Sequence, residues 1–183
     1  MKSPNPRYLP MKSLHGVQLK RFLREYKRSH ERRRDIVALL QSVEYPYNVG
    51  AIFRLADGVG ISKLILTGIT PSPPNLTIAK VGRSKDRNVP WQYAENPDGP
   101  LQEIRETGYQ IIALELTESA VPYDEYDYPE KVCLVAGHED HGVTKNVLAY
   151  CDAAVFAPMY GKGRSLNVSA ALGIVAYHIR QLK

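Results

Sequence analysis

Continuous apolar runs alternate along this chain with segments in which apolar residues recur every three or four positions. The runs predict buried β-strands, which we expect at 35–43, 63–68, 109–116, 131–137 and 153–159. The periodic segments predict helices, which we expect at 48–60, 100–108, 143–151 and in the second half of 160–179. Apolar strands that alternate with helices are typical of an α/β domain with a mostly parallel sheet flanked by helices.

The first 34 residues break this pattern and carry the excess positive charge. The chain holds 24 Lys and Arg against 19 Asp and Glu, and 11 of the basic but 3 of the acidic residues lie within 1–35. We therefore predict a basic arm, helical or flexible, at 1–34 and a folded domain at 35–183. A solvated helix or tail would have the same composition, but such an arm also suits binding to a polyanion, above all nucleic acid. Its candidate RNA-binding residues are Lys20, Arg21, Arg24, Arg32, Arg33 and Arg34.

The composition argues against export and membrane insertion. No apolar run approaches the roughly 18 residues of a membrane helix. The first 16 residues lack the apolar core of a signal peptide. Cys133 and Cys151 lie beside apolar residues without metal-ligand spacing, so we expect reduced core cysteines and a cytoplasmic protein.

Three polar segments follow predicted strands, at 48–54, 137–142 and 160–167. Ligands of open parallel sheets bind at the carboxyl ends of the strands, so these segments are the candidate site. The glycines of "GHEDHGVT" have P-loop spacing, but Val143 stands where the lysine is needed, which disfavours a nucleoside triphosphatase. "GVG" at 58–60 follows a helix and lacks the third glycine of a dinucleotide-binding fingerprint. His138 and His141 have no indicated third ligand, so we expect no metal site.

Together the segments "NVGAIFRLADGVG" (48–60), "LVAGHEDHGV" (134–143) and "APMYGKGRSLNVSAALGIVAYHI" (157–179) resemble the SpoU/TrmH branch of the SPOUT RNA methyltransferases. The resemblance covers residues 35–181. It implies a deep trefoil knot at the carboxyl-terminal end of the sheet, which pattern rules would not suggest. It also implies a homodimer that binds S-adenosyl-L-methionine, releases S-adenosyl-L-homocysteine and methylates a ribose 2′-hydroxyl of tRNA or rRNA without a metal.

The resemblance assigns catalytic roles to residues that also have ordinary structural explanations. Asn48 is a candidate helix N-cap, Arg54 could be an exposed or paired cation, and Glu139 a solvated loop acid. Ser165 and Asn167 suit the start of a helix. In the family the arginine is often assigned as the base that takes the hydroxyl proton. Because a guanidinium has no acceptor while protonated, its role as base or positioning group stays open. The resemblance implies catalytic Asn48, Arg54, Glu139, Ser165 and Asn167.

The same resemblance implies a cofactor site built largely from backbone groups. Its residues are Leu114, Gly137, Ala157, Met159, Ser165 and Leu166. The family commonly has Ile where Ala157 stands, and a backbone contact survives that change. A dry pocket with backbone hydrogen bonds suits a sulfonium whose charge disperses during methyl transfer.

A second basic segment, "KVGRSKDR" at 80–87, is either a solvated loop or a further phosphate contact. Its candidate RNA-binding residues are Lys80, Arg83 and Lys85. We expect Trp91, just beyond, to pack against the protein rather than to stack on a base.

The alternatives are an rRNA 2′-O-methyltransferase and a non-catalytic RNA-binding protein with the same fold. We favour tRNA because the chain is compact and lacks the folded amino-terminal domain often appended to rRNA enzymes. The five catalytic candidates are all present, which argues against lost activity.

Overall fold

The computed structural model describes residues 12–30 and 34–182, and the chain divides into two units, 1–32 and 33–183. In the first unit, helix α1 (Gly16–Ser29) has no buried residue. Its exposed apolar residues Leu19, Phe22, Leu23 and Tyr26 recur at helical spacing. The predicted Lys20, Arg21 and Arg24 are exposed on α1, and Arg21 pairs with Glu25 at 3.6 Å. Arg32 and Arg33 lie outside the described residues.

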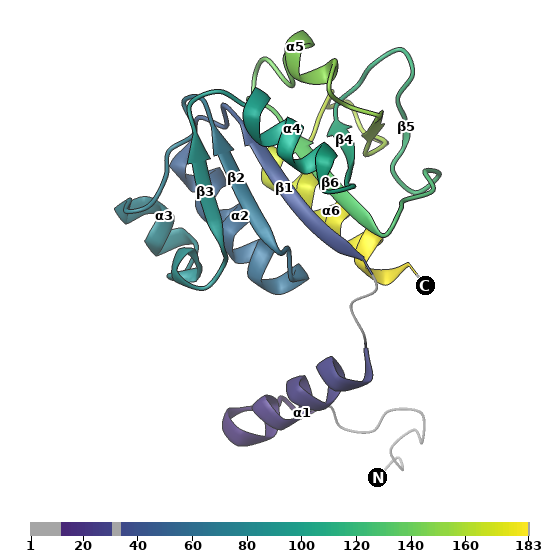
Figure 1. Cartoon of the computed structure of the whole chain (residues 1–183). Helices are drawn as coiled ribbons and strands as arrows, with labels where there is room; N and C mark the ends of the chain where they lie inside the picture. Colours follow the sequence, from purple (N-terminus) through teal and green to yellow (C-terminus); the bar gives the residue numbers. More distant parts are fainter. Residues whose placement is uncertain (1–11, 31–33, 183) are drawn as a thin grey trace. The chain divides into compact units, whose positions relative to one another are not determined.

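The second unit is built on a seven-stranded parallel sheet, as the apolar runs predict (Figure 1). Its order is β3-β2-β1-β6-β4-β7-β5. The strands are β1 (Asp35–Gln41), β2 (Lys63–Thr67), β3 (Trp91–Ala94), β4 (Gln110–Leu114), β5 (Val121–Pro122), β6 (Lys131–Ala136) and β7 (Ala153–Phe156). Five of these match the expected strands, while the edge strands β3 and β5 are additional.

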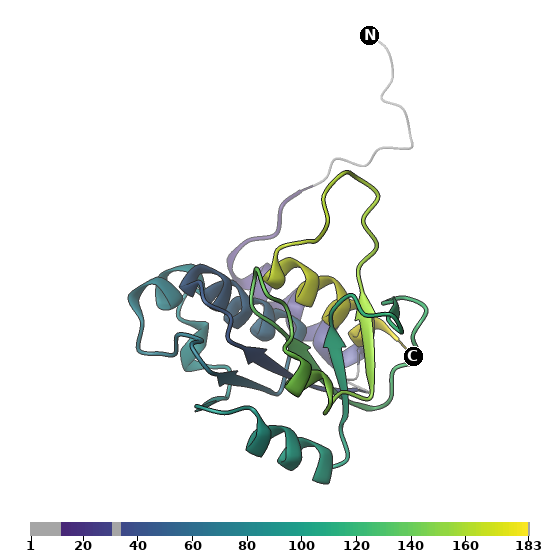
Figure 2. The same ribbon diagram turned by 90° about the horizontal axis from the view of Figure 1, so that it is seen from above.

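Helices cover both faces of the sheet (Figures 1 and 2). Alternate residues of β1 show why: Ile36, Ala38 and Leu40 pack in the core cluster that includes residues of three helices, while Val37 and Leu39 pack in the opposite cluster. The first group of helices is α2 (Pro46–Val59), α3 (Leu76–Val81) and α6 (Val168–Gln181). The second is α4 (Asp98–Glu106) and α5 (Lys145–Leu148).

Two predicted helix starts are wrong by a few residues. The helix expected from Asn48 begins at Pro46, whose fixed φ suits the first turn, so Asn48 lies inside α2 and caps nothing. The last helix begins at Val168, and its cap is Asn167, whose side chain accepts a hydrogen bond from the Ser169 N–H; Ser165 lies further upstream.

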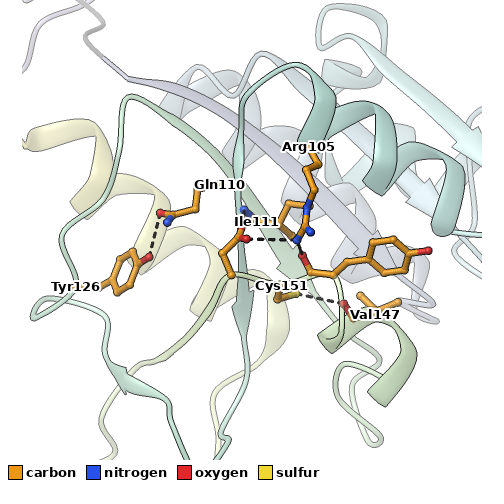
Figure 3. Close-up of polar contacts among 8 residues, drawn as sticks. Arg105, Gln110, Ile111, Tyr126, Val147 and Cys151 are labelled. Atoms are coloured by element: carbon orange, nitrogen blue, oxygen red, sulfur yellow. Dashed lines mark hydrogen bonds and ion pairs between the residues drawn. The ribbon is translucent and has the colours of Figure 1, made fainter.

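The two cysteines are both free, as expected for reduced core residues. Cys133 is fully buried in β6, and its burial raises the pKa of the thiol. Cys151 is half-buried and donates to the carbonyl of Val147 at 3.4 Å (Figure 3). Nearby, the tyrosine-rich segment is tied to the sheet by the Tyr126 hydroxyl, which donates to the side chain of Gln110.

The order of the strands creates a switch point between β1 and β6. From β1 the chain continues through α2 to β2 on one side, whereas from β6 it continues through α5 to β7 on the other. The segments that follow β1 and β6 therefore leave neighbouring strands toward opposite sides, which opens a crevice between them. Among the described residues no helix is long and apolar enough to cross a membrane. The trefoil knot implied by the resemblance stays a prediction.

Candidate active site at the switch point

A cavity of about 620 Å³ lies at the carboxyl ends of β4, β6 and β7. Segments after all three strands line it, together with the start of α6. Residues 137–142, which we call the glycine loop, form one side, and the basic loop, residues 159–166, approaches from another. The volume falls within the range of about 300–1,000 Å³ typical of small-molecule sites.

Glu139 joins the glycine loop to the segment after β1. Its Oε2 accepts from the backbone N–H of Glu44 at 2.9 Å, and its Oε1 accepts from Tyr45 N at 3.3 Å and from the Asn48 side chain at 2.6 Å. Burial of this carboxyl raises its pKa, but the hydrogen bonds from Asn48 and the backbone outweigh burial, so the pKa of Glu139 lies below its usual value. Glu139 is thus held as a carboxylate that fixes two loops together.

Asn48 and Asn167 extend this network to α6. The Asn167 side-chain amide donates to Asn48 Oδ1 at 2.9 Å, and Asn167 Oδ1 accepts from the N–H and hydroxyl of Ser169. Three of the predicted catalytic residues, from three separate segments, therefore form one continuous hydrogen-bonded chain. The residue that caps α6 also belongs to the wall of the cavity.

The glycine loop closes tightly on itself. A Cβ on Gly137 would lie 2.2–2.4 Å from backbone atoms of Gly142 and Val143, and the backbones of His138 and Gly142 pair in both directions. The resemblance implies that Gly137 belongs to the cofactor site. The structure shows that the loop itself already requires a glycine at this position.

The predicted cofactor residues divide into those that line the cavity and one that does not. Leu114, Gly137, Ala157, Ser165 and Leu166 all line it. Met159, in the basic loop, lies outside the lining and is 36% exposed.

Arg54 stands apart from the other catalytic candidates. It is exposed on α2, does not line the cavity, and makes no hydrogen bond or ion pair with any residue that the structure describes. Six residues separate it from Asn48, so the two project from different sides of the helix.

The predicted RNA-binding residues of the second unit differ in their surroundings. Lys80 and Arg83 are exposed, whereas Lys85 pairs with Asp57 at 2.8 Å. Arg34 is half-buried and donates to the carbonyls of Tyr128 and Leu182, so its contacts in the structure hold the protein together. RNA binding by any of these residues stays a prediction.

Sequence reasoning missed Glu115, which also lines the cavity. Its carboxylate accepts from the N–H of Val143 at 2.8 Å and from its own neighbour Leu116 at 2.9 Å, so it supports the far end of the glycine loop. Its position at the end of the predicted strand 109–116 was the available signal. His138, which the sequence offers only as a candidate metal ligand, lies near the segment after β1, with its Nε2 3.4 Å from Glu44 Oε2.

The parallel sheet, its switch point and the polar network beside a ligand-sized cavity define an α/β protein of the class whose small-molecule sites lie at the carboxyl ends of the strands. The model of the SpoU rRNA Methylase family matches residues 35–177, so the chain belongs to this family.

Several known proteins are similar to the chain. A tRNA (guanosine(18)-2′-O)-methyltransferase of Escherichia coli is 30% identical over 150 residues, which cover 82% of this chain and 65% of that protein. The chain thus spans somewhat under two thirds of that relative. The crystal structure of the Aquifex aeolicus TrmH/SpoU tRNA modifying enzyme is 29% identical, with a TM-score of 0.74 over 89% of this chain and 82% of that one. The crystal structure of an AdoMet-bound rRNA methyltransferase from Sinorhizobium meliloti is 30% identical, with a TM-score of 0.74. The match covers 84% of this chain and 59% of that chain.

Proposed function

We propose that this chain transfers a methyl group from S-adenosylmethionine to a ribose 2′-hydroxyl of RNA, with tRNA as the favoured substrate, in the cytoplasm. The observation that carries the proposal is the Asn167–Asn48–Glu139 chain at the switch point, beside a cavity at the carboxyl ends of β4, β6 and β7, in a member of the SpoU family. Similarity to the tRNA methyltransferase of E. coli favours tRNA.

The cavity suits S-adenosylmethionine in size and in chemistry. Leu114, Leu116, Phe156 and Leu166 supply apolar wall for an adenine ring, and the strand ends offer backbone groups. The lining carboxylates Glu115 and Glu139 already accept hydrogen bonds from the protein. The cofactor would supply an activated methyl group on a sulfonium, and the predicted lining residues Gly137, Ala157, Ser165 and Leu166 would hold it.

The network argues for Glu139 as a positioning residue. Its oxygens receive three N–H donors and its pKa is lowered, so it is poorly suited to take the hydroxyl proton. Asn48 and Asn167, tied to it, would place Ser165 and the start of α6 against the substrate ribose.

Arg54 would act on the RNA rather than on the cofactor. An exposed guanidinium without a protein partner can hold a phosphate and a ribose hydroxyl together through its planar fork. Because Arg54 does not line the cavity of its own chain, we propose a homodimer in which it serves the partner's site. Exposed apolar residues on α6, Ile174 and Tyr177, support such an interface.

The basic arm and the 80–87 segment would hold the rest of the RNA through its phosphates. Removing residues 1–34 should weaken RNA binding and flatten its dependence on salt, because fewer counterions are then released. Binding of S-adenosylhomocysteine should persist in the truncated protein. An unchanged salt dependence would contradict a role for the arm.

The proposal is tested by incubating the protein with labelled S-adenosylmethionine and unmodified tRNA or rRNA, and by mapping 2′-O-methyl positions. We expect Arg54→Lys to abolish most turnover while cofactor affinity is unchanged, since a point charge does not reproduce the fork. Arg83→Lys is the matched control, because a simple phosphate contact tolerates the exchange. Methylation of rRNA alone would show that rRNA, rather than tRNA, is the substrate. Absence of methyl transfer to either RNA would overturn the proposal.

A further inference from the structure

A second cavity, of about 460 Å³, lies at the opposite edge of the sheet from the cofactor cavity. It is formed by the start of α3, the short helical turn Lys85–Arg87 and the first residue of β3, and shares no residue with the first cavity. Its lining consists of Pro73, Pro74, Asn75, Leu76, Ala79, Asp86, Arg87 and Trp91. The phosphate contacts proposed for segment 80–87 leave the cavity itself without a role.

Asp86 gives the cavity an unused acceptor. Its Oδ1 is buried without a hydrogen-bond partner, and Asp86 makes no ion pair with the described residues. The neighbouring Asn75 contrasts with it, since its side-chain oxygen already accepts from the N–H groups of Thr77 and Ile78. A buried carboxylate oxygen without a donor is uncommon in proteins. Because Asp86 also lines the cavity, rotation of its side chain toward the cavity would let a ligand with N–H groups satisfy this oxygen.

The rest of the lining suits a flat aromatic ring. Trp91 packs against the core in part, as expected, but it also borders the cavity and keeps some exposure. Leu76 is 91% exposed beside it, and two prolines add further apolar surface. Partly exposed aromatic surface and exposed apolar surface beside a basic segment are the usual composition of a site where nucleobases stack.

The charges around the cavity indicate what the ring is attached to. Lys80, Arg83 and Arg87 are exposed on the segment that forms it, while Lys85 is paired with Asp57. The surroundings are thus positive and the interior holds one free carboxylate, so the complementary ligand has N–H donors on its ring and phosphates outside.

We propose that this cavity binds an unpaired nucleobase of the substrate RNA, one with an amino group, at a distance from the nucleotide that is methylated. The inference rests on RNA as the substrate. Adenine, cytosine and guanine each present an amino donor to Asp86, whereas the single ring N–H of uracil is flanked by two carbonyl oxygens that a carboxylate repels. The site would select RNAs with such a base exposed at the right place.

Trp91 is the only tryptophan of the chain, so its fluorescence reports on this cavity directly. The full-length protein, saturated with S-adenosylhomocysteine to block the first cavity, is titrated with AMP, CMP, GMP and UMP. We expect saturable quenching by the first three and about tenfold weaker binding of UMP, because hydrogen bonds to a charged group are among the stronger ones. Absence of saturable quenching by any nucleotide would overturn the proposal, as would quenching by a proline-rich peptide instead.

Asp86→Asn keeps the shape of the side chain and removes its charge. The affinity for the amino-bearing nucleotides should fall toward that for UMP, and Asp98→Asn, at an exposed position on α4, should change nothing. Equal affinities in wild type and Asp86→Asn would refute the role of Asp86.

Leu76→Glu tests the same site at a position too exposed to affect folding. It should weaken RNA binding by repelling phosphates and leave S-adenosylhomocysteine affinity unchanged, and unchanged RNA affinity would count against the site. Methyl transfer without quenching of Trp91 by nucleotides would contradict the nucleobase site but not the proposed activity. Quenching of Trp91 without methyl transfer would contradict the proposed activity but not the nucleobase site.

Discussion

The two loops beside the cofactor cavity are held in opposite ways. The glycine loop, 137–142, is fixed by Glu139, by its own backbone pairing and by Glu115. In the basic loop every residue is exposed, Tyr160 by 97%, and none makes a hydrogen bond or ion pair with the described part of the chain. One side of the site is therefore built before any ligand arrives, whereas the other is free to adapt to cofactor, RNA or a second subunit.

The largest contrast is expected from matched glycine substitutions in the two loops. Gly137→Ala places a methyl group within 2.2–2.4 Å of backbone atoms, which cannot move without distorting the glycine loop. A Cβ on Gly161 meets nothing within 4 Å. Chemical denaturation should show a loss of about 3 kcal/mol for Gly137→Ala and less than about 0.5 kcal/mol for Gly161→Ala. Equal losses in the two variants would mean that the glycine loop is not tightly closed.

A smaller effect is expected where charge rather than shape is removed. Glu139→Gln replaces one acceptor oxygen by an NH2 group, which then faces either the N–H of Glu44 or the donors of Tyr45 and Asn48. The free energy of unfolding should therefore fall by about 2 kcal/mol, a value that already allows for the partial exposure of Glu139. Asp140→Asn, at the exposed neighbouring position, serves as the control and should be near neutral. A Glu139→Gln protein as stable as wild type would show that the hydrogen bonds accepted by Glu139 contribute nothing to the free energy of unfolding.

The hydrogen bonds accepted by the Glu139 carboxylate should also weaken in acid. The pKa of Glu139 is lowered in the folded protein, so its stabilisation is complete above the pKa of the unfolded chain and disappears as the pH falls through the folded value. The stability difference between wild type and Glu139→Gln should therefore shrink as the pH is lowered past the usual glutamate range. A difference that grows in acid would have the wrong sign.

The smallest effect on stability is expected in the basic loop. Tyr160→Ala should change the free energy of unfolding by less than about 0.5 kcal/mol, because the ring touches almost nothing. Hydrogen exchange should show rapid exchange of 159–166 that slows with S-adenosylhomocysteine, while 137–142 is protected in both states. Protection of the basic loop in the absence of ligand would contradict the conclusion that this loop is free to adapt while the glycine loop is fixed.

Features that depend on local sequence could be predicted, whereas features that depend on the long-range strand order could not. Apolar runs located the five main strands because their burial on both faces requires continuous apolar sequence, but β3 and β5 lie at the edges, where burial is partial and that signal fades. The family pattern pointed to Glu139, Asn48 and Asn167. Their mutual hydrogen bonds depend on the switch point between β1 and β6, a long-range strand order that no local pattern contains. Asn167 does cap its helix, whereas the predicted cap Asn48 lies inside α2 and serves the network instead.

The most direct test of the account is calorimetric titration of the protein with S-adenosylhomocysteine. Wild type and Gly161→Ala should bind it alike, and Gly137→Ala should lose most of the affinity because its closed loop forms the wall of the cavity. Absence of binding to wild type at millimolar ligand, or undiminished binding to Gly137→Ala, would contradict a cofactor site at the switch point.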